Sequence, residues 1–586
     1  MEKWFLAAKK ADFKRIGQKF HINPVTARII RNRDIIGDEQ IEQYLHGSLS
    51  DLNDAEQLKG SKEAAVLLKE KIEQKKQIRI IGDYDIDGVN ATYILYSALK
   101  KLGARVDYEI PDRMKDGYGL NQNLIRLAFE EGTDTIVTCD NGITAIEQIA
   151  YAKELGMTVI VTDHHEPLFT EEAGEKCWNL PKPDVLIDPK LPDCPYPYKK
   201  LCGAAVAWKC MIVLYRVMNR KEEELEEYIP FAAVATVGDV MDLDGENRIL
   251  VREGLIRLGQ VPNPGVQALI RATGLDQARL SSYHIGFVLG PCINASGRLD
   301  TAKRSLQLLL AEKEEEACRL AEELKQLNDE RKDLTARGVE AAVQQIETTS
   351  LKEDKVLVIY LPDCHESIAG IIAGRIRERY SKPVFVLTNG EGCVKGSGRS
   401  IESYSMFDEM IKCQDLFLKF GGHPMAAGLS LPLEKVEDFR RRINQLCTLT
   451  EEDFFQKIMI DVPMPINYIR EDLIEEFQLL EPFGKGNQKP LFAEKNLSLK
   501  RALILGKNRN VLKMMVVNQE HTAMTAMFFG NIEEFQSYLQ QKFGHTETEK
   551  LFQGQENSIK LSVTYYPSIN EYMGRKTLQI VIQNYQ

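Results

Sequence analysis

The sequence lacks a run of hydrophobic residues long enough to cross a membrane. No apolar stretch among its 586 residues approaches the roughly 18 uninterrupted residues that a membrane helix needs. The first residues, Met1-Glu2-Lys3-Trp4, do not begin a secretory signal. We therefore expect a cytoplasmic protein, and its hydrophobic content of 44% is enough to fill several domain cores.

Cysteine pairs and the motifs of two large enzyme classes are also missing. The 11 cysteines are scattered, and no two of them form a C-x-x-C pair. The odd count and this spacing argue against a disulfide framework and against a zinc knuckle. The chain has neither a G-x-S-x-G nucleophile elbow nor a G-x-x-x-x-G-K-[ST] loop. These absences argue against a serine hydrolase and against a P-loop nucleotide-binding enzyme.

The chain has no net excess of basic residues either. Its formal charge is −11, whereas nucleic-acid binding usually depends on a basic surface. The distribution matters more than the sum, because residues 484–515 carry basic side chains against Glu494 alone. The basic residues of this run are Lys485, Lys489, Lys495, Lys500, Arg501, Lys507, Arg509 and Lys513. Charge alone leaves open whether they form a nucleic-acid surface or a solvated charged face.

What the chain does contain is four acidic and imidazole clusters, each after an apolar, strand-like run. β-branched runs at 78–81, 135–138 and 157–161 alternate with helix-length amphipathic segments. This alternation predicts an α/β fold with a parallel sheet, whose ligands bind outside the carboxyl ends of the strands. We expect the clusters to meet there. They lie at 82–88 (with Asp83, Asp85 and Asp87), 139–142 (with Asp140), 162–165 (with His164 and His165) and 237–239 (with Asp239).

The residue types in these clusters predict a metal site. Three carboxylates at one strand exit are tolerable mainly if cations neutralise them, although any one of them could lie in an exposed acidic turn. Asp140 and Asp239 could each cap a helix instead. The mixed Asp and His set favours two Mn²⁺ ions, with Mg²⁺ as the competitor, because imidazole is a poor ligand for Mg²⁺. Two-metal sites of this kind hydrolyse phosphodiesters by in-line displacement.

The two histidines are assigned different roles. Adjacent residues of an extended backbone cannot point the same way, so one ring can bind a metal while the other faces the substrate. We assign His164 to a metal and His165 to the scissile phosphate or its hydrogen-bond network. The predicted metal ligands are Asp83, Asp85, Asp87, Asp140, His164 and Asp239, and the predicted catalytic set is Asp85, Asp87, Asp140, His164, His165 and Asp239.

In this order, the motifs resemble those of the DHH phosphoesterase superfamily, and within it the RecJ family of single-strand-specific DNA exonucleases. The resemblance runs from about residue 20 to the C-terminus. It implies that Asp85 and Asp87 bind metal directly, with Asp83 either a ligand or a neighbour of the ligands. The segment 237–243 has Gly and Asp where the family pattern has Ala and Pro, which puts no ligand in doubt.

Further segments resemble the substrate-binding parts of the same family. Gly396-Ser397-Gly398-Arg399-Ser400 combines flexible backbone, a hydroxyl and a guanidinium, which suits a phosphate. The segment 420–428 resembles the Gly-Gly-His segment of the DHHA1 domain, with a structural glycine turn as the alternative. The resemblance implies a terminal 5′-phosphate pocket of Arg113, Ser397 and Arg399, a base platform at Tyr118, and contacts from Asn294, Arg298, Gly422 and His423.

The resemblance also implies the order of domains. We expect an N-terminal helical segment (1–60), a DHH catalytic domain with a parallel sheet (61–300), a long connecting helix (301–346), a DHHA1 α/β domain (347–448) and a C-terminal β-barrel (449–586). The barrel is interpreted as an OB-fold, which frequently binds single strands.

The implied activity is 5′→3′ hydrolysis of single-stranded DNA in recombination and repair. The expected partners are single-stranded DNA, a single-strand-binding protein and a RecQ-type helicase. The alternatives are a nanoRNA or cyclic-dinucleotide phosphodiesterase of the same superfamily and an inactive DNA-binding scaffold. The residues alone do not determine whether the substrate is DNA or RNA. They also do not determine whether Asp83 and His165 bind metal directly.

Overall fold

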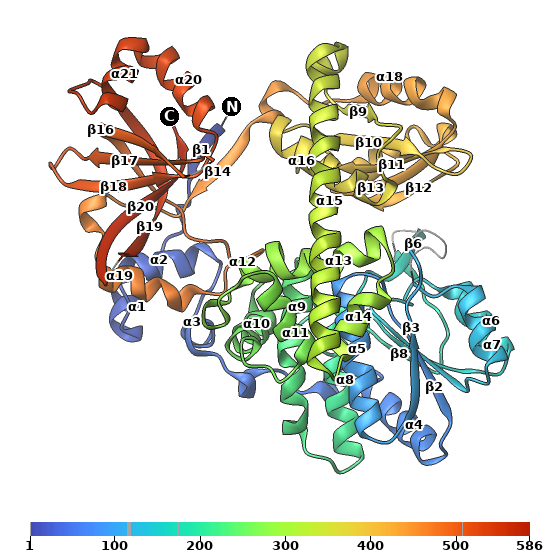
Figure 1. Ribbon diagram of the computed structural model, residues 1–586. Helices are drawn as coiled ribbons and strands as arrows, with labels where there is room; N and C mark the ends of the chain where they lie inside the picture. Colours follow the sequence, from blue (N-terminus) through green and yellow to red (C-terminus); the bar gives the residue numbers. More distant parts are fainter. Residues whose placement is uncertain (1, 114–118, 173–174, 507, 573) are drawn as a thin grey trace. The chain divides into compact units, whose positions relative to one another are not determined.

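Figure 1 shows a computed structural model of the chain, which describes residues 2–113, 119–172, 175–506, 508–572 and 574–586. The chain forms two compact units. Unit 1 comprises residues 49–456, and unit 2 combines residues 2–48 with residues 457–586. Among the described residues, no helix has both the length and the apolar character needed to cross a membrane.

The first sheet of unit 1 is parallel throughout and has the strand order β3-β2-β4-β5-β8. Its strands are β2 (Gln77–Ile81), β3 (Arg105–Glu109), β4 (Thr135–Cys139), β5 (Thr158–Thr162) and β8 (Val185–Ile187). Every residue of β4 is buried, as expected for a parallel strand that is covered on both faces. The predicted parallel α/β sheet is confirmed.

Successive residues of these strands point to opposite faces of the sheet. Val137 packs in one core with α4 (Ser61–Glu73), α5 (Ile86–Lys101) and α8 (Gly203–Val217). Its neighbour Ile136 packs in a second core with α6 (Gln122–Glu130) and α7 (Ile146–Glu154). Between β5 and β8 the chain forms a separate antiparallel hairpin of β6 (Leu168–Glu172) and β7 (Glu175–Asn179).

The rest of the first domain is helical. The segment before Asp239 was predicted to be strand-like, and this prediction is wrong: residues Ile229–Gly238 form α9, and Asp239 follows the end of that helix. An apolar run of this length cannot be assigned to a strand or a buried helix by its pattern alone. The other helices are α10 (Gly245–Leu258), α11 (Pro264–Ala272), α12 (Ser282–His284), the π-helical turn η5 (Ile285–Leu289), α13 (Gly290–Leu299) and α14 (Lys303–Leu310).

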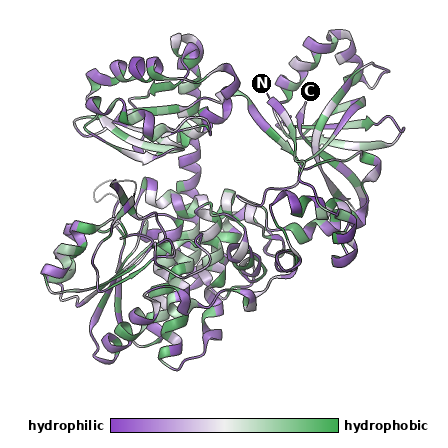
Figure 2. Cartoon of the chain, turned by 180° about the vertical axis from the view of Figure 1, so that it is seen from behind, coloured by the Kyte–Doolittle hydropathy of each residue, from purple (hydrophilic) through white to green (hydrophobic). Residues whose placement is uncertain are grey.

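A long helix, α15 (Glu314–Thr348), joins the first domain to the second sheet of unit 1. Its 35 residues span roughly 50 Å at the usual helical rise. The part of α15 that lies between the two sheets of unit 1 is coloured mostly hydrophilic in Figure 2. The predicted connecting helix began at 301, but the structure has α14 first and an extended residue, Ala311, between the two helices.

The second sheet of unit 1 is mixed and has the order β12-β13-β11-β10-β9. Only β9 and β10 are parallel, and the other neighbours are antiparallel. The strands are β9 (Leu357–Tyr360), β10 (Val384–Asn389), β11 (Val394–Arg399), β12 (Lys419–His423) and β13 (Ala426–Leu431). The helices are α16 (Ala369–Tyr380), α17 (Met406–Ile411) and α18 (Val436–Leu446).

Unit 2 contains a closed barrel, which confirms the predicted OB-type fold. Its five strands pair in the circular order β16-β17-β18-β20-β19, and β19 pairs back with β16. β16 is long and irregular in register, so one end pairs with β17 and the other with β19. The elements are β15 (Val462–Pro463), α19 (Glu471–Glu476), β16 (Phe492–Leu505), β17 (Val511–Val517), β18 (Ala523–Phe528), α20 (Ile532–Phe543), α21 (His545–Gln553), β19 (Lys560–Tyr572) and β20 (Arg575–Tyr585).

The N-terminal residues 2–48 fold with this barrel. β1 (Glu2–Leu6) pairs with β14 (Gln456–Ile460) in a two-stranded sheet, and α1 (Phe13–Phe20), α2 (Pro24–Asn32) and α3 (Asp38–His46) follow. Ile30 and Leu45 lie in one core with barrel residues such as Phe492. Arg33 Nη1 and Nη2 donate to the two carboxylate oxygens of Asp461, at 2.6 and 3.1 Å. The segment predicted at 1–60 is therefore divided between the two units.

This packing predicts that Ile30→Ala destabilises unit 2 without loosening unit 1. Ile30 is fully buried, and such truncations remove about 2–5 kcal/mol from the free energy of unfolding. Hydrogen exchange of the β17 amides should accelerate, while the β10 amides of unit 1 serve as the internal reference. Ile36→Ala, at an exposed position of the same segment, is the matched control. Unchanged exchange in β17 would mean that residues 2–48 do not stabilise the barrel.

Candidate metal centre

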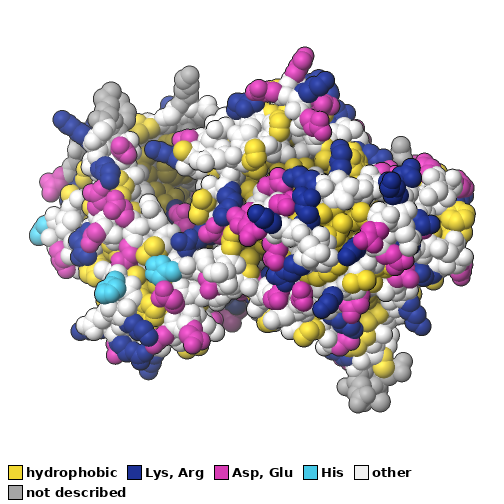
Figure 3. All heavy atoms as spheres, turned by 90° about the horizontal axis from the view of Figure 1, so that it is seen from below, with side chains coloured by type: hydrophobic (Ala, Val, Ile, Leu, Met, Phe, Trp, Pro, Cys, Tyr) yellow, Lys and Arg dark blue, Asp and Glu magenta, His cyan; other side chains and the backbone are white. Residues whose placement is uncertain are grey.

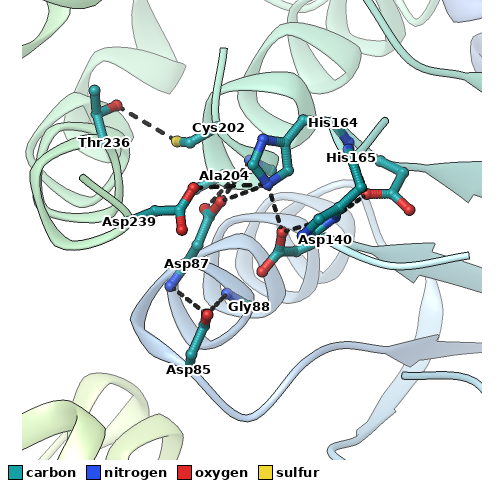
Figure 4. Close-up of polar contacts among 12 residues, drawn as sticks. Asp85, Asp87, Gly88, Asp140, His164, His165, Cys202, Ala204, Thr236 and Asp239 are labelled. Atoms are coloured by element: carbon teal, nitrogen blue, oxygen red, sulfur yellow. Dashed lines mark hydrogen bonds and ion pairs between the residues drawn. The ribbon is translucent and has the colours of Figure 1, made fainter. Parts of the chain in front are cut away.

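Carboxylates and imidazoles from four separate segments meet at the carboxyl edge of the parallel sheet. They follow β2, β4, β5 and α9, and Figure 4 shows Asp87, Asp140 and Asp239 around the ring of His164. The structure brings together all six predicted ligands and His165. Three groups have ligand atoms within 4.8 Å of one another: Asp140, His164 and His165; Asp87, His164 and Asp239; and Asp83, Asp85 and Asp140.

Two helix N-termini position the acidic residues that follow β2. Asp85 is the N-cap of α5, and its Oδ1 accepts from the backbone N–H groups of Asp87 (2.9 Å) and Gly88 (3.1 Å). The carboxylate of Asp87 accepts from the first N–H groups of α8, at 2.6 Å from Gly203 and 2.7 Å from Ala204. Helix N-termini carry a partial positive charge that favours carboxylates. The fold thereby holds both side chains in fixed orientations.

The ring of His164 is the meeting point of three carboxylates. Its Nε2 lies 3.0 Å from Asp140 Oδ1, 3.5 Å from Asp87 Oδ2 and 3.8 Å from Asp239 Oδ2. Burial, followed by the neighbouring His165, lowers the pKa of His164 to about 4. The imidazole is therefore neutral at physiological pH, which is the form that binds metals.

The electrostatics of the carboxylates fit divalent cations. Burial, reinforced by Asp85, raises the pKa of Asp87 to about 6, and burial, reinforced by Asp87, raises that of Asp239 to about 7. Burial and neighbouring carboxylates also raise the pKa values of Asp83 and Asp140 well above their usual range. Among the described residues, Oδ1 of Asp83 is buried and has no hydrogen-bond partner. A buried cluster of like charges with such an oxygen suits cations, and its mixed O and N donors suit Mn²⁺.

Asp163 is a site residue that the sequence-based assignment passed over. Its Oδ1 accepts from the backbone N–H of His164 (2.7 Å) and lies 2.7 Å from Nδ1 of His165. Its Oδ2 accepts from the backbone of Ile143 (2.8 Å). Burial opposes its ionisation, yet the bond to His165 keeps the pKa of Asp163 below its usual value. The sequence feature that could have identified Asp163 is its position directly before the two histidines. A carboxylate there can fix the orientation of an imidazole ring.

Three of the predicted substrate residues carry guanidinium groups that lie close together. Arg113 Cζ is 5.0 Å from the ring centroid of Tyr84, and Nη1 of Arg298 donates to Ser367 O at 2.7 Å. Burial, followed by the charges of Arg113, Arg331 and Arg399, lowers the pKa of Arg298 to about 10. Burial and then Arg113 also lower the pKa of Arg399. The charges of Arg113 and Arg399 therefore act on Arg298, and the phosphate site predicted there stays a prediction.

A cavity of about 470 Å³ is lined by Arg113 and Ser397 of the predicted pocket, but not by Arg399. Tyr84, Lys395 and Lys419, which the sequence analysis did not single out, also line it. These three come from two different domains of unit 1, so only the tertiary fold brings them together.

Four other predicted substrate residues have different outcomes. Asn294 Oδ1 accepts from the backbone N–H of Ile86 at 2.8 Å, so this side chain organises the start of α5. Gly422 and His423 are exposed residues of strand β12 next to Phe420 and Gly421, which line the cavity, and their predicted contact with a phosphate stays a prediction. Strand pairing with β13 fixes the backbone there. Tyr118 lies outside the described residues.

The fold and the site together define a phosphoesterase of the DHH class. The family model for the DHH family, N-terminal domain, matches residues 77–236. The DHHA1 domain model matches residues 353–449, and the RecJ OB domain model matches residues 460–584.

The curated relatives narrow the class further. The chain is 35% identical to the single-stranded-DNA-specific exonuclease RecJ of Bacillus subtilis, over 97% of this chain and 69% of the relative. It is 33% identical to RecJ of Salmonella typhimurium, over 96% of this chain and 95% of the relative. The crystal structure of RecJ from Thermus thermophilus in complex with Mn²⁺ is similar with a TM-score of 0.81 and 27% identity, and covers 100% of this chain and 79% of that one. The chain belongs to the RecJ family.

Replacing one central carboxylate tests the metal centre. Asp140 has φ 61°, a conformation that Asn tolerates, so Asp140→Asn keeps the shape and removes one charge. Because the pKa values of the site carboxylates are raised, the metal-free folded state binds protons more tightly than the unfolded state. Its stability therefore falls as pH rises through about 6 to 7. Without metal at pH 8, Asp140→Asn should melt at a higher temperature than wild type.

With Mn²⁺ at pH 8, wild type should melt at a higher temperature than Asp140→Asn. The ligands of the ion must be deprotonated, so Mn²⁺ should raise the melting temperature of the wild type far more at pH 8 than at pH 5.5, and that of Asp140→Asn only slightly. The matched control is Asp134→Asn, because Asp134 pairs with Lys71 away from the site. Calorimetry with EDTA and with Mn²⁺ checks both effects. An equal Mn²⁺ shift in wild type and Asp140→Asn would remove Asp140 from the metal centre.

Proposed function

We propose that the chain is a single-strand-specific exonuclease that hydrolyses DNA from the 5′ end in a metal-dependent reaction. The observation that carries this proposal is the arrangement of two sites of opposite charge in unit 1. Buried carboxylates form one of them, and the cluster of Arg113, Arg298 and Arg399 forms the other. The first fits cations and the second fits a terminal phosphate. Membership of the RecJ family supports DNA as the substrate.

Six side chains would hold two divalent ions. Asp83, Asp85 and Asp140 form one ligand group, and Asp87, His164 and Asp239 form the other. Such a pair activates a water molecule and stabilises the attacking and leaving oxygens of the displacement. The mixed donor set supports Mn²⁺ with Mg²⁺ as an alternative, and the RecJ structures from Thermus thermophilus are in complex with Mn²⁺ and with Mg²⁺.

His165 serves the phosphate rather than the ions in this proposal. Burial opposes protonation of His165, but the bond to Asp163 outweighs it and raises the pKa of the metal-free ring to about 9. Asp163 holds Nδ1 at 2.7 Å and so orients the ring, which in this proposal donates to an oxygen of the scissile phosphate. Asp163 is then a positioning residue that fixes the ring.

The arginine cluster would select the end of the strand. Burial, followed by the charge of Arg113, lowers the pKa values of Arg298 and Arg399. Such a cluster would gain most from a dianion, and a terminal phosphate carries more charge than an internal phosphodiester. Ser397 adds a hydroxyl to the cavity lining. An end held in this way fixes which phosphodiester lies at the carboxylates, so cleavage would be exonucleolytic and would proceed 5′→3′.

The barrel would hold the rest of the single strand. OB-folds bind single strands with basic grooves and stacking aromatics. Lys489 Nζ lies 3.4 Å from the ring centroid of Tyr566, while Lys507 lies outside the described residues. Figure 3 shows acidic and basic side chains intermixed on the one face of the chain that it displays.

Other elements of the proposal follow from the family. The cytoplasmic location, the role in recombination and repair, and the partners, a single-strand-binding protein and a RecQ-type helicase, stay predictions. The complete set of ligands argues against an inactive scaffold. The three-domain architecture argues against a shorter-chain dinucleotide phosphodiesterase.

The polarity and strand specificity are tested with end-labelled oligonucleotides. We expect Mn²⁺-dependent release of a mononucleotide from the 5′-labelled end of single-stranded DNA and slow cleavage of blunt duplex DNA, since a duplex offers no unpaired 5′ end. RNA of the same sequence tests the sugar preference. Release of label from the 3′ end first, or equal cleavage of single and double strands, would contradict the proposal.

Arg399→Ala tests the phosphate pocket. Wild type should prefer 5′-phosphorylated over 5′-hydroxyl ends, and the variant should lose about 1.5–3 kcal/mol of that preference, the range for hydrogen bonds to charged groups. Competition between the two substrates measures the preference directly. Arg375→Ala, on the exposed side of the adjacent helix α16, is the control and should keep it. If Arg399→Ala slows both substrates equally, Arg399 only supports the neighbouring backbone.

A further inference from the structure

Two aromatic rings stand exposed on the first domain, next to the segment that leads into α13. Tyr283 and Phe287 are 62% and 65% exposed, and they are stacked with centroids 4.9 Å apart and planes at 25°. Single exposed apolar residues are common on protein surfaces. Two large rings stacked on each other are different, because each shields one face of its partner and leaves the other face open.

The backbone beneath the rings is irregular and firmly held. Phe287 lies in the π-helical turn η5, a conformation that is rare and frequent at functional sites. Its neighbours Ile285 and Leu289 are buried in the core. Before the turn, the Ser281 backbone N–H donates to Nδ1 of His284 at 3.1 Å. The rings are therefore presented by a fixed support rather than by a loose loop.

The backbone that carries the ring pair packs against the end of α9, which precedes Asp239. A Cβ placed on Gly238 would lie 2.5 Å from Cγ2 of Ile86, and one placed on Gly290 would lie 3.1 Å from Cδ1 of the same side chain. Ile86 thus separates the end of α9 from the end of η5. The first of these ends precedes Asp239. The next residue, Val240, has φ 56°, which is strained for a β-branched side chain, and it is 61% exposed.

Helix α13 fixes the direction in which the substrate would run. Phe287 lies just before its first turn, and Arg298, of the arginine cluster, lies at its end. Ten residues lie between the two, and eleven helical steps span roughly 16 Å. Between them, Asn294 accepts from the N–H of Ile86 at the start of α5. Asp85, which precedes Ile86, therefore lies beside α13 at Asn294, a position between Phe287 and Arg298 in the sequence.

We propose that Tyr283 and Phe287, bordered by Val240, form a stacking platform for the bases of the single strand a few nucleotides to the 3′ side of the cleaved bond. The inference rests on the proposed function, which places the 5′ phosphate at the arginine cluster. Unpaired bases offer flat apolar faces that stack on aromatic rings with little regard to sequence. Paired bases do not offer these faces, so the platform also favours single strands over duplexes.

The test combines protein and DNA changes on the full-length chain. The double variant Tyr283→Ala/Phe287→Ala and wild type are compared on 5′-phosphorylated single strands of 20 nucleotides, either intact or with abasic sites at positions 3–6. A trinucleotide serves as the short substrate. On the intact long strand, the variant should raise KM about fivefold or more, the scale of losing one stacked base, with kcat little changed.

If the rings stack on bases, the effects of the abasic sites and of the double variant on KM should not add. Abasic sites should raise KM for wild type but add little in the variant, because both changes remove the same contact. Cleavage of the trinucleotide should be unaffected, and Tyr283→Phe should behave as wild type. The matched control is Phe129→Ala, which removes a 46% exposed ring from α6 near the amino edge of the sheet.

Two kinds of failure are separable. If the double variant cleaves the long strand with the KM of wild type, or if the abasic and protein effects simply add, the platform is refuted and the rings serve another surface. If wild type itself cleaves no single strand, the proposed function fails and the platform fails with it.

Discussion

Mutual repulsion among buried carboxylates is the constraint on which the first domain of this chain depends. Asp83, Asp87, Asp140 and Asp239 all have raised pKa values because burial and one another's charges disfavour ionisation. The fold offsets part of this repulsion with the N-termini of α5 and α8, whose N–H groups bind Asp85 and Asp87. The remainder calls for cations. Without metal, such a preorganised site lowers the stability of the folded chain. Active sites often reduce stability in this way.

The same domain also carries a cluster of positive charge. Arg113 and Arg298 lie towards the second sheet, which contributes Arg399 and the Ser397 lining of the cavity. The charge of Arg113 also reaches the carboxylates, because it opposes the rise in the pKa of Asp83 that burial causes. In the proposed function, a substrate whose terminal phosphate binds the arginine cluster would bring an adjacent phosphodiester towards the carboxylates, and this would set the direction of cleavage.

The sequence predicted the chemistry of the centre better than its surroundings. The strands before Asp83, Asp140 and His164 were predictable because β-branched runs alternate with amphipathic helices, and parallel strands deliver their ends to one edge. The helix before Asp239 was not, since a short apolar run fits a buried helix equally well. The assignment of residues 2–48 to the barrel depends on contacts such as Arg33 with Asp461, which lie far apart in sequence. Likewise, Gly422 and His423 became strand residues because β13 pairs with them, a tertiary effect that a glycine-rich motif does not reveal.

The central claim is that these side chains bind a pair of interacting ions. Electron paramagnetic resonance of the full-length chain titrated with Mn²⁺, together with the bound stoichiometry, tests it most directly. The account predicts two Mn²⁺ ions per chain with a spin-coupled spectrum, because Asp140 belongs to two of the three ligand groups and His164 lies 3.0 Å from it. A single bound ion, or two ions with the spectrum of isolated Mn²⁺, would contradict it.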